Sequence, residues 1–251
     1  MSDLIRNGIF LKNNISCWAY AHSFSQSYVY CKSPFLVDPS KAFITFSKRY
    51  YLLNDQLLHY NLSRINCNDN VLIGPLFRNY KTNLNLGKTF KDKFIISIFT
   101  CSSSKNTFNS KEAHKKFFKD LFKLMSELND KYIFLIKLKN KKFLHKDFDY
   151  IFKSDLYNKF KNKRIFILDP NQPSSKIVNS SNLIISMAFT SPTFEALSAN
   201  KPAIFFDPNK AAKNNYFKKI ENLYITDWKS LKSFIENLRY EELTNNWIQQ
   251  T

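Results

Sequence analysis

The sequence has little glycine, few cysteines and no long apolar run. Only 3 of its 251 residues are glycine. The four cysteines, Cys17, Cys31, Cys67 and Cys101, form no CxxC pair or Cys/His cluster, which excludes a zinc site or disulfide framework and indicates free thiols. No apolar run approaches the roughly 18 residues of a membrane-spanning helix, and the first residues lack a signal-peptide core. The sequence therefore predicts a cytoplasmic protein that at most rests on a membrane surface.

Positive charge is abundant. The chain has 38 Lys and Arg against 20 Asp and Glu, a formal net charge of +18. Such an excess favours an anionic partner, which could be nucleic acid, a phospholipid surface or a phosphorylated small molecule. Part of the excess is typical of AT-rich genomes, which also favour Asn, Ile, Phe and Tyr over Gly. Neither an aromatic RNP segment nor a GXXG loop is present, so nucleic acid is the least favoured partner.

From residue 92 onward, short apolar runs alternate with segments of helical periodicity. Strands are predicted at 94–100, 132–138, 164–168, 182–186, 202–206 and 223–226. Helices are predicted at 109–129, 147–160, 173–181, 192–199 and 227–243. Short strands that alternate with helices imply parallel βαβ units. We therefore expect residues 88–251 to form one α/β domain with a Rossmann-like, doubly wound parallel sheet.

The first 87 residues give weaker signals. Apolar segments within 42–60 and 70–79 indicate short strands, the first of them running into a helix. These segments are too few for a second complete sheet. We expect residues 1–87 to form a partial N-terminal α/β segment, with 81–93 as the linker.

The run FTSPTFEAL, residues 189–197, follows a predicted strand and continues into a predicted helix. Ser191 is a favoured N-cap residue, Pro192 suits the first helical position, and Asn200 provides a stop signal. Ligands of open α/β sheets bind beyond the carboxyl ends of the strands. This loop is therefore expected to face the ligand crevice.

The residues of this loop suit a nucleotide. The N–H groups of a helix start, together with the hydroxyls of Thr190 and Ser191, can hold a phosphate. Glu195, one turn further along, can accept hydrogen bonds from ribose hydroxyls. The residues alone leave a second interpretation open, in which Ser191 only caps its helix and Glu195 is a solvated helical residue.

Residues 185–208 resemble part of the bacterial polysaccharide-biosynthesis glycosyltransferases of the GT-B fold, in particular the group named after a Pro-Phe-Thr-Ser (PFTS) motif. Residues 188–191 read Ala-Phe-Thr-Ser, so alanine replaces the motif proline. The Glu195-Ala196-Leu197 segment and the following Lys201-Pro202 are also similar to the nucleotide region of GT-B enzymes, with Asn200 where a glycine is usual. The resemblance implies that residues 88–251 are the GT-B C-terminal domain.

The resemblance also implies a substrate-binding site. Thr190 and Ser191 would hold the donor phosphate and Glu195 the donor ribose. Ser186 and Phe189 belong to the same substrate-binding run.

Two lysines extend this implied site. Residues 132–142 are similar to a family strand that ends in a Lys-Pro-Lys-Arg-like segment, which places Lys137 and Lys139 at the crevice rim. As point charges, they would neutralise a donor diphosphate or the acid group of a sugar. Judged without the resemblance, both are equally well explained as solvated lysines at a strand end.

By this resemblance, the chain is expected to be a metal-independent glycosyltransferase, or a truncated descendant of one, that needs no cofactor. Its partners would be a nucleotide-sugar donor and a saccharide or lipid-linked acceptor in capsule, O-antigen or lipopolysaccharide assembly, with peripheral association at the inner membrane. GT-B enzymes usually take the acceptor and the catalytic base from the N-terminal domain, of which this sequence resembles only the last part. His22 is a weak candidate for the base, because imidazole titrates near neutral pH. Met187 stands where retaining GT-B enzymes commonly carry a second glutamate, which favours a different branch.

Two other functions remain open at this point. One is a basic binding module for RNA or an anionic membrane surface, which would bind long polyanions in a strongly salt-dependent way. The other is a nucleotide-sugar epimerase of related fold, which would need catalytic acids and histidines that the sequence does not reveal.

Overall fold

The chain divides into two structural units, residues 1–77 and 78–251, and each has its own sheet. The structure is a computed structural model. It describes residues 9–10, 12–16, 18–20, 49–52, 70–72, 82–87, 90, 92–101, 110–139, 153–188, 190–210 and 222–238.

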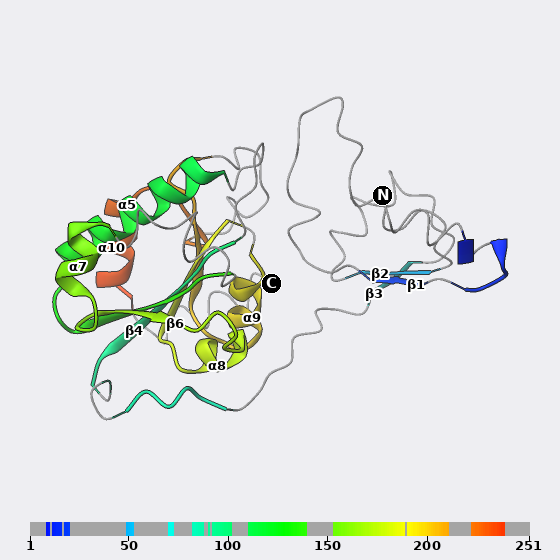
Figure 1. Cartoon of the computed structure of the whole chain (residues 1–251), viewed down its shortest axis with the longest axis horizontal. Helices are drawn as coiled ribbons and strands as arrows, with labels where there is room; N and C mark the ends of the chain where they lie inside the picture. The colour runs from blue at the N-terminus through cyan, green and yellow to red at the C-terminus, as the bar shows by residue number, and fades with distance from the viewer. Residues whose placement is uncertain are drawn as a thin grey trace. The chain divides into compact units, whose positions relative to one another are not determined.

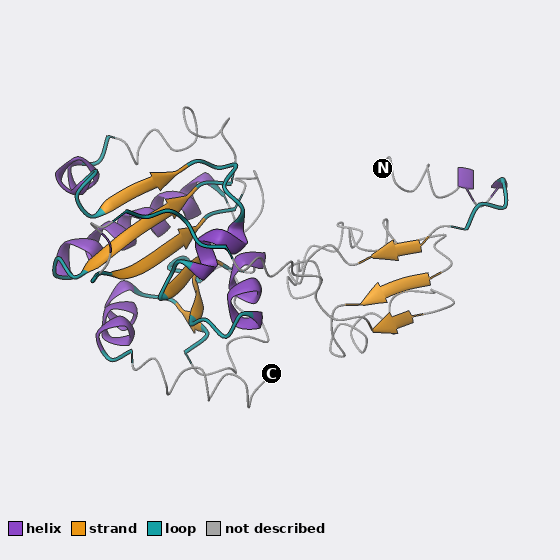
Figure 2. Cartoon of the chain, turned by 90° about the horizontal axis from the view of Figure 1, so that it is seen from below, coloured by secondary structure: helices purple, strands orange, loops and turns teal. Residues whose placement is uncertain are grey.

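The described part of the first unit contains a small parallel sheet. Its strands are β1 (Trp18–Tyr20), β2 (Arg49–Leu52) and β3 (Asn70–Leu72), in the order β1-β2-β3. Figure 2 shows these three arrows side by side. Both β2 and β3 fall within the two segments from which short strands are predicted.

The second unit is built on a six-stranded sheet with the order β6-β5-β4-β7-β8-β9, in which all neighbouring strands are parallel. The strands are β4 (Phe94–Phe99), β5 (Tyr132–Lys137), β6 (Ile165–Leu168), β7 (Leu183–Met187), β8 (Ala203–Phe206) and β9 (Tyr224–Ile225). This order confirms the predicted Rossmann-like, doubly wound sheet. Each strand lies within one residue of its predicted position.

Helices cover both faces of this sheet (Figure 1). They are α5 (Lys111–Glu127), α7 (Asp155–Phe160), α8 (Ser174–Asn179), α9 (Ser191–Ser198) and α10 (Trp228–Glu236). Helix α5 packs against α7 and α10, whereas α8 packs against α9, so the two groups occupy opposite faces. Among the described residues, no helix is both long and apolar enough to cross a membrane.

Four helices are shorter than predicted, and α5 is shorter by only two residues at each end. Helix α7 begins only at Asp155, and the earlier part of its predicted range, 147–152, lies outside the described residues. Helix α8 ends at Asn179 because the hydroxyls of Ser180 and Ser181 donate to the carbonyl oxygens four residues before them. Helix α10 ends at Glu236, with Asn237 as its C-cap.

The hydrophobic core is rich in phenylalanine. It lies between the sheet and its helices, and β7 and β8 are buried along their whole length. The largest fully buried side chains are Phe117, Phe118, Phe134, Phe205, Phe206, Ile96 and Ile98. Much of the aromatic content of the sequence is therefore used to fill this core.

Asparagine occupies turn positions at which glycine is common. The described residues with positive φ other than glycine are Asn14, Asn162, Asn200, Asn222 and Lys210. Asparagine enters the left-handed region more easily than most residues because its short amide can form local hydrogen bonds. A chain with only 3 glycines can therefore still make these turns.

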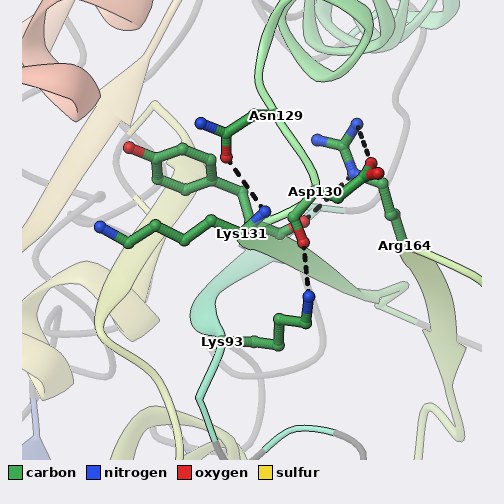
Figure 3. A network of polar contacts seen from close by, with 6 residues as sticks. Lys93, Asn129, Asp130, Lys131 and Arg164 are labelled. Carbon is green, nitrogen blue, oxygen red and sulfur yellow. Dashed lines mark hydrogen bonds and ion pairs between the residues drawn. The ribbon is translucent and has the colours of Figure 1, made fainter.

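A polar network joins the amino-terminal ends of β4, β5 and β6 (Figure 3). Lys93 Nζ donates to the carbonyl oxygen of Asp130 at 3.0 Å, and Arg164 Nη1 lies 3.4 Å from Asp130 Oδ1. Arg164 also donates from Nε to the carbonyl oxygen of Tyr132 at 3.3 Å. Lys131 lies beside the Tyr132 ring, with Nζ 6.0 Å from its centroid. The basic side chains at this edge thus stabilise the sheet.

Candidate functional site

The strand order reverses between β4 and β7. From β4, the chain adds β5 and β6 on one side, and it then adds β7, β8 and β9 on the other side. In open α/β sheets, such a reversal leaves a crevice beyond the carboxyl ends of the central strands, where ligands bind. Residues that follow β4, β5, β6 and β7 are therefore the candidates for a functional site.

Thr190, and not Ser191, is the N-cap of α9. Ser191 is the first helical residue and is exposed, and Pro192 follows it. The Thr190 hydroxyl donates to the carbonyl oxygen of Met187 at 3.0 Å and makes no capping hydrogen bond. The predicted Ser191 cap is thus wrong by one residue, because both residue types favour caps and the backbone decides between them. The start of α9 is left without a side-chain cap, so its N–H groups are suited to an anion.

Ser186 lies in β7 and is completely buried. Its hydroxyl is hydrogen-bonded to the hydroxyl of Thr193, which is equally buried. This pair attaches the first turn of α9 to β7 and so sets where the helix begins. Ser186 has no exposed surface, and it supports the loop from within the core.

Glu195 lies half-buried on α9 and accepts a hydrogen bond from the side chain of Ser174. Ser174 is the first residue of α8, which packs against α9. Burial raises the pKa of the Glu195 carboxyl above its ordinary value, and the hydrogen bond from Ser174 and the charge of Lys137 oppose this rise. The carboxylate is therefore held in place while keeping part of its surface open.

Lys137 is the last residue of β5 and is half-buried, whereas Lys139 is exposed. Burial lowers the pKa of the Lys137 ammonium group and the charge of Lys139 lowers it further, while Glu195 and Asp169 act in the opposite direction. The Lys139 N–H donates to Thr100 Oγ1 at 3.2 Å, just beyond β4. The structure therefore brings Lys137 and Glu195 together and keeps Lys139 at the rim.

Asn200, at the end of α9, takes the place of the glycine that is usual at this position in GT-B enzymes. Asn200 has a φ of 53°. Its N–H donates to the Leu197 carbonyl oxygen at 3.0 Å, and the Lys201 N–H donates to that of Ala196 at 2.8 Å. These two bonds form a Schellman motif, which requires a left-handed residue at this position. The turn that leads from α9 into β8 thus forms without glycine.

His114 joins the two ends of the segment between β4 and α5. This buried side chain places Nε2 3.0 Å from the carbonyl oxygen of Cys101 and Nδ1 3.0 Å from that of Ser110. Cys101 Sγ lies 3.6 Å from Met187 Sδ, which links the end of β4 to the end of β7. His114 therefore shapes the edge of the crevice from inside the protein.

Two predicted site residues, Phe189 and His22, lie outside the described residues. Two residues that sequence reasoning missed, Ser174 and Asp169, lie near Glu195 and Lys137. Asp169 directly follows β6, so its place after a predicted strand was a usable signal. Ser174 gave no such signal, because its contact with Glu195 depends on the packing of two helices.

The family of polysaccharide-biosynthesis PFTS motif proteins has a model that matches residues 8–235, most of the chain. The chain belongs to this family. Within the motif, residues 188–191, Ala188 replaces the motif proline and directly follows β7, Thr190 is the N-cap of α9 and Ser191 is its first residue. The match confirms the resemblance that the sequence indicated. No curated protein sequence matches the chain.

Solved structures confirm the GT-B type of fold. S. aureus MnaA with UDP has a TM-score of 0.65 and 15% identity, covering 96% of this chain and 65% of that one. The wall teichoic acid polymerase TagF has a TM-score of 0.58 and 14% identity, and the match covers 94% of this chain and 62% of TagF. Anabaena HepE in complex with UDP and glucose has a TM-score of 0.56 and 10% identity, and the match covers 97% of this chain and 68% of HepE. The chain thus spans about two thirds or less of the length of these proteins, and the likeness shows the fold.

Proposed function

We propose that the chain provides the donor-binding domain of a metal-independent glycosyltransferase that acts in bacterial surface-polysaccharide biosynthesis in the cytoplasm. The observation that carries this proposal is the convergence of an uncapped helix start, a half-buried lysine and a half-buried carboxylate at the strand-order reversal. Family membership supports the process, and the presence of UDP in two structures of similar fold supports the class of ligand.

In this proposal, the donor lies beyond the ends of β4, β5 and β7. The N–H groups at the start of α9 and the hydroxyls of Thr190 and Ser191 bind the phosphates. Lys137 balances their charge, and Glu195 accepts hydrogen bonds from the ribose hydroxyls. Ser186 contributes indirectly, because its bond to Thr193 positions the helix start.

The reaction is the transfer of a sugar from the nucleotide to an acceptor hydroxyl. The hydroxyl oxygen bonds to the anomeric carbon, the bond from that carbon to the donor phosphate oxygen breaks, and a base takes the hydroxyl proton. The departing nucleotide gains negative charge, which the helix start and Lys137 stabilise. We propose a saccharide or lipid-linked acceptor. The proposals of His22 as the base and of Phe189 and Lys139 as donor contacts rest on the sequence.

The test is calorimetric titration of the purified chain with UDP, GDP, CDP and CMP at two salt concentrations, with heparin as a polyanion control. We expect one nucleotide to bind at both salt concentrations. The double variant Thr190→Ala/Ser191→Ala should weaken that binding by about tenfold or more, because hydrogen bonds to a charged group are lost. The variant Ser198→Ala removes an exposed serine from the other end of α9 and should bind as the unmodified chain does.

The outcomes of this titration separate the possibilities. Unchanged affinity in the double variant would show that the phosphates bind elsewhere. Binding of heparin alone, lost at the higher salt concentration, would show that the chain recognises charge and would refute the donor-site proposal.

A further inference from the structure

Four lysines form a line along the solvent face of α5. Lys111, Lys115, Lys119 and Lys123 are all exposed and recur every four residues. Residues spaced by four lie on the same face of a helix, about 6 Å apart along its axis. These four residues, the lysine stripe, therefore present an inclined row of ammonium groups that turns by about 40° around the helix with each step of four residues.

The lysine stripe places like charges next to one another along α5. Like charges four residues apart repel each other and weaken a helix. None of the four ammonium groups forms an ion pair with another described residue. By contrast, the neighbouring Lys116 donates to the carbonyl oxygen of Pro208 at 2.6 Å. The stripe is thus free to meet an anionic surface.

The lysines at the amino-terminal edge of the sheet differ in this respect. Lys93 donates to a carbonyl oxygen, and Lys131 lies beside the Tyr132 ring (Figure 3). Lys159 and Lys161 lie over the rings of Phe160 and Tyr157, with Nζ 5.4 and 5.8 Å from the ring centroids. These side chains have partners within the domain, which makes them a matched control for the stripe.

The position of α5 relates the stripe to the candidate site. The helix begins at Lys111, after the segment that leaves the carboxyl end of β4, so one end of the stripe lies at the crevice edge of the sheet. Figure 1 shows α5 as the long green helix on the outside of the domain. A flat surface that contacts the stripe would therefore run up to the edge at which the donor is proposed to bind.

We propose that the lysine stripe docks this domain onto anionic phospholipid headgroups and so holds the crevice at the membrane surface. Each lysine near such a surface adds to the attraction. The exposed residues of α5 include no apolar or aromatic side chain that could insert into lipid. The docking is therefore electrostatic, reversible and sensitive to salt. Only its purpose, access to a lipid-linked acceptor, rests on the proposed function.

A membrane fits the stripe better than a nucleic acid does. Proteins that bind single strands combine a groove with aromatic side chains on which bases stack, and the exposed face of α5 offers neither. Lysine is a compact point charge, whereas arginine presents the planar fork that recognises individual phosphates. A convex row of lysines matches a diffuse, planar negative charge.

The test is co-sedimentation with phosphatidylcholine vesicles, with and without phosphatidylglycerol. We expect binding only to the anionic vesicles. Replacing Lys111, Lys115, Lys119 and Lys123 by glutamine should weaken it by on the order of a hundredfold. The control variant replaces Lys93, Lys131, Lys159 and Lys161 by glutamine, which removes the same charge, and it should change binding by about threefold at most. Circular dichroism establishes that both variants are folded.

Equal losses in the two variants would overturn the proposal, because net charge would then explain the binding. Binding of the stripe to single-stranded RNA in preference to anionic vesicles would also overturn it. The nucleotide titration is repeated on the stripe variant. If the unmodified chain binds no nucleotide, the proposed function is contradicted. If the two lysine variants bind anionic vesicles equally, only the docking inference is contradicted.

Discussion

Lys137 and Glu195 interact electrostatically beyond the carboxyl ends of the strands, although they come from β5 and α9. Each is half-buried, and burial works against the charge of both. Their mutual attraction opposes this effect, as opposite charges favour each other's ionised forms. A half-buried charge pair of this kind is typical of functional sites, where pKa shifts cluster.

The variant Glu195→Gln tests the ribose contact. Glutamine keeps the size of the side chain and removes its charge, so nucleotide affinity should fall by about 10- to 100-fold. Calorimetric titration measures this change. Glu127→Gln is the control, since Glu127 is exposed at the end of α5 and pairs with Lys232. Equal affinities in both variants would show that Glu195 does not contact the ribose.

Nucleotide affinity should depend on pH through Glu195. The ionised carboxylate is the better acceptor, and burial raises its pKa above the ordinary 4.5. Affinity should therefore decline on acidification with a midpoint above 4.5. Titrations across the acidic range check this, and the slope should be absent in Glu195→Gln. A midpoint at or below the ordinary value would contradict the burial of this group.

The same pKa shift predicts the pH dependence of stability. The folded-state pKa of Glu195 exceeds the unfolded value, so the folded state binds the proton more tightly. The stabilisation is complete below the unfolded pKa and is lost as the pH rises through the folded pKa. As the pH rises through this window, the free energy of unfolding of the unmodified chain should therefore fall relative to that of Glu195→Gln. Urea unfolding at several pH values measures the difference, and a difference that grows in the opposite direction would refute it.

The hydrogen bond between Ser186 and Thr193 should behave as a coupled pair. Ser186→Ala and Thr193→Val each leave one buried hydroxyl without its partner, at a cost of about 1–3 kcal/mol in the free energy of unfolding. The double variant removes both groups, so its cost should be smaller than the sum of the two single costs. Urea unfolding of all four proteins provides the cycle. Additive costs would mean that the two hydroxyls act independently.

Asn200 should be replaceable by glycine and not by alanine. Because its φ is 53°, glycine should stabilise the fold by a few tenths of a kcal/mol up to about 1 kcal/mol, and alanine should destabilise it by about 1 kcal/mol. The midpoint of urea unfolding distinguishes the two. Destabilisation by glycine would show that the Asn200 side chain has a further role.

The strands of the second unit could be predicted from the sequence because each is a continuous apolar run such as Phe94–Phe99, covered on both faces. The start of α9 could be predicted to within one residue, because Pro192 suits the first turn of a helix. Its N-cap could not, since Thr190 and Ser191 are both suitable and the choice depends on the backbone. The hydrogen bond from Ser174 to Glu195 was also beyond prediction, because it forms only when α8 and α9 pack together.

The most direct test of the account is a crystal structure of the chain with the nucleotide that binds most tightly. The account predicts that the phosphates lie at the start of α9, within hydrogen-bond distance of the Thr190 and Ser191 hydroxyls, and that the ribose hydroxyls face Glu195. A nucleotide bound elsewhere, with the start of α9 unoccupied, would contradict it.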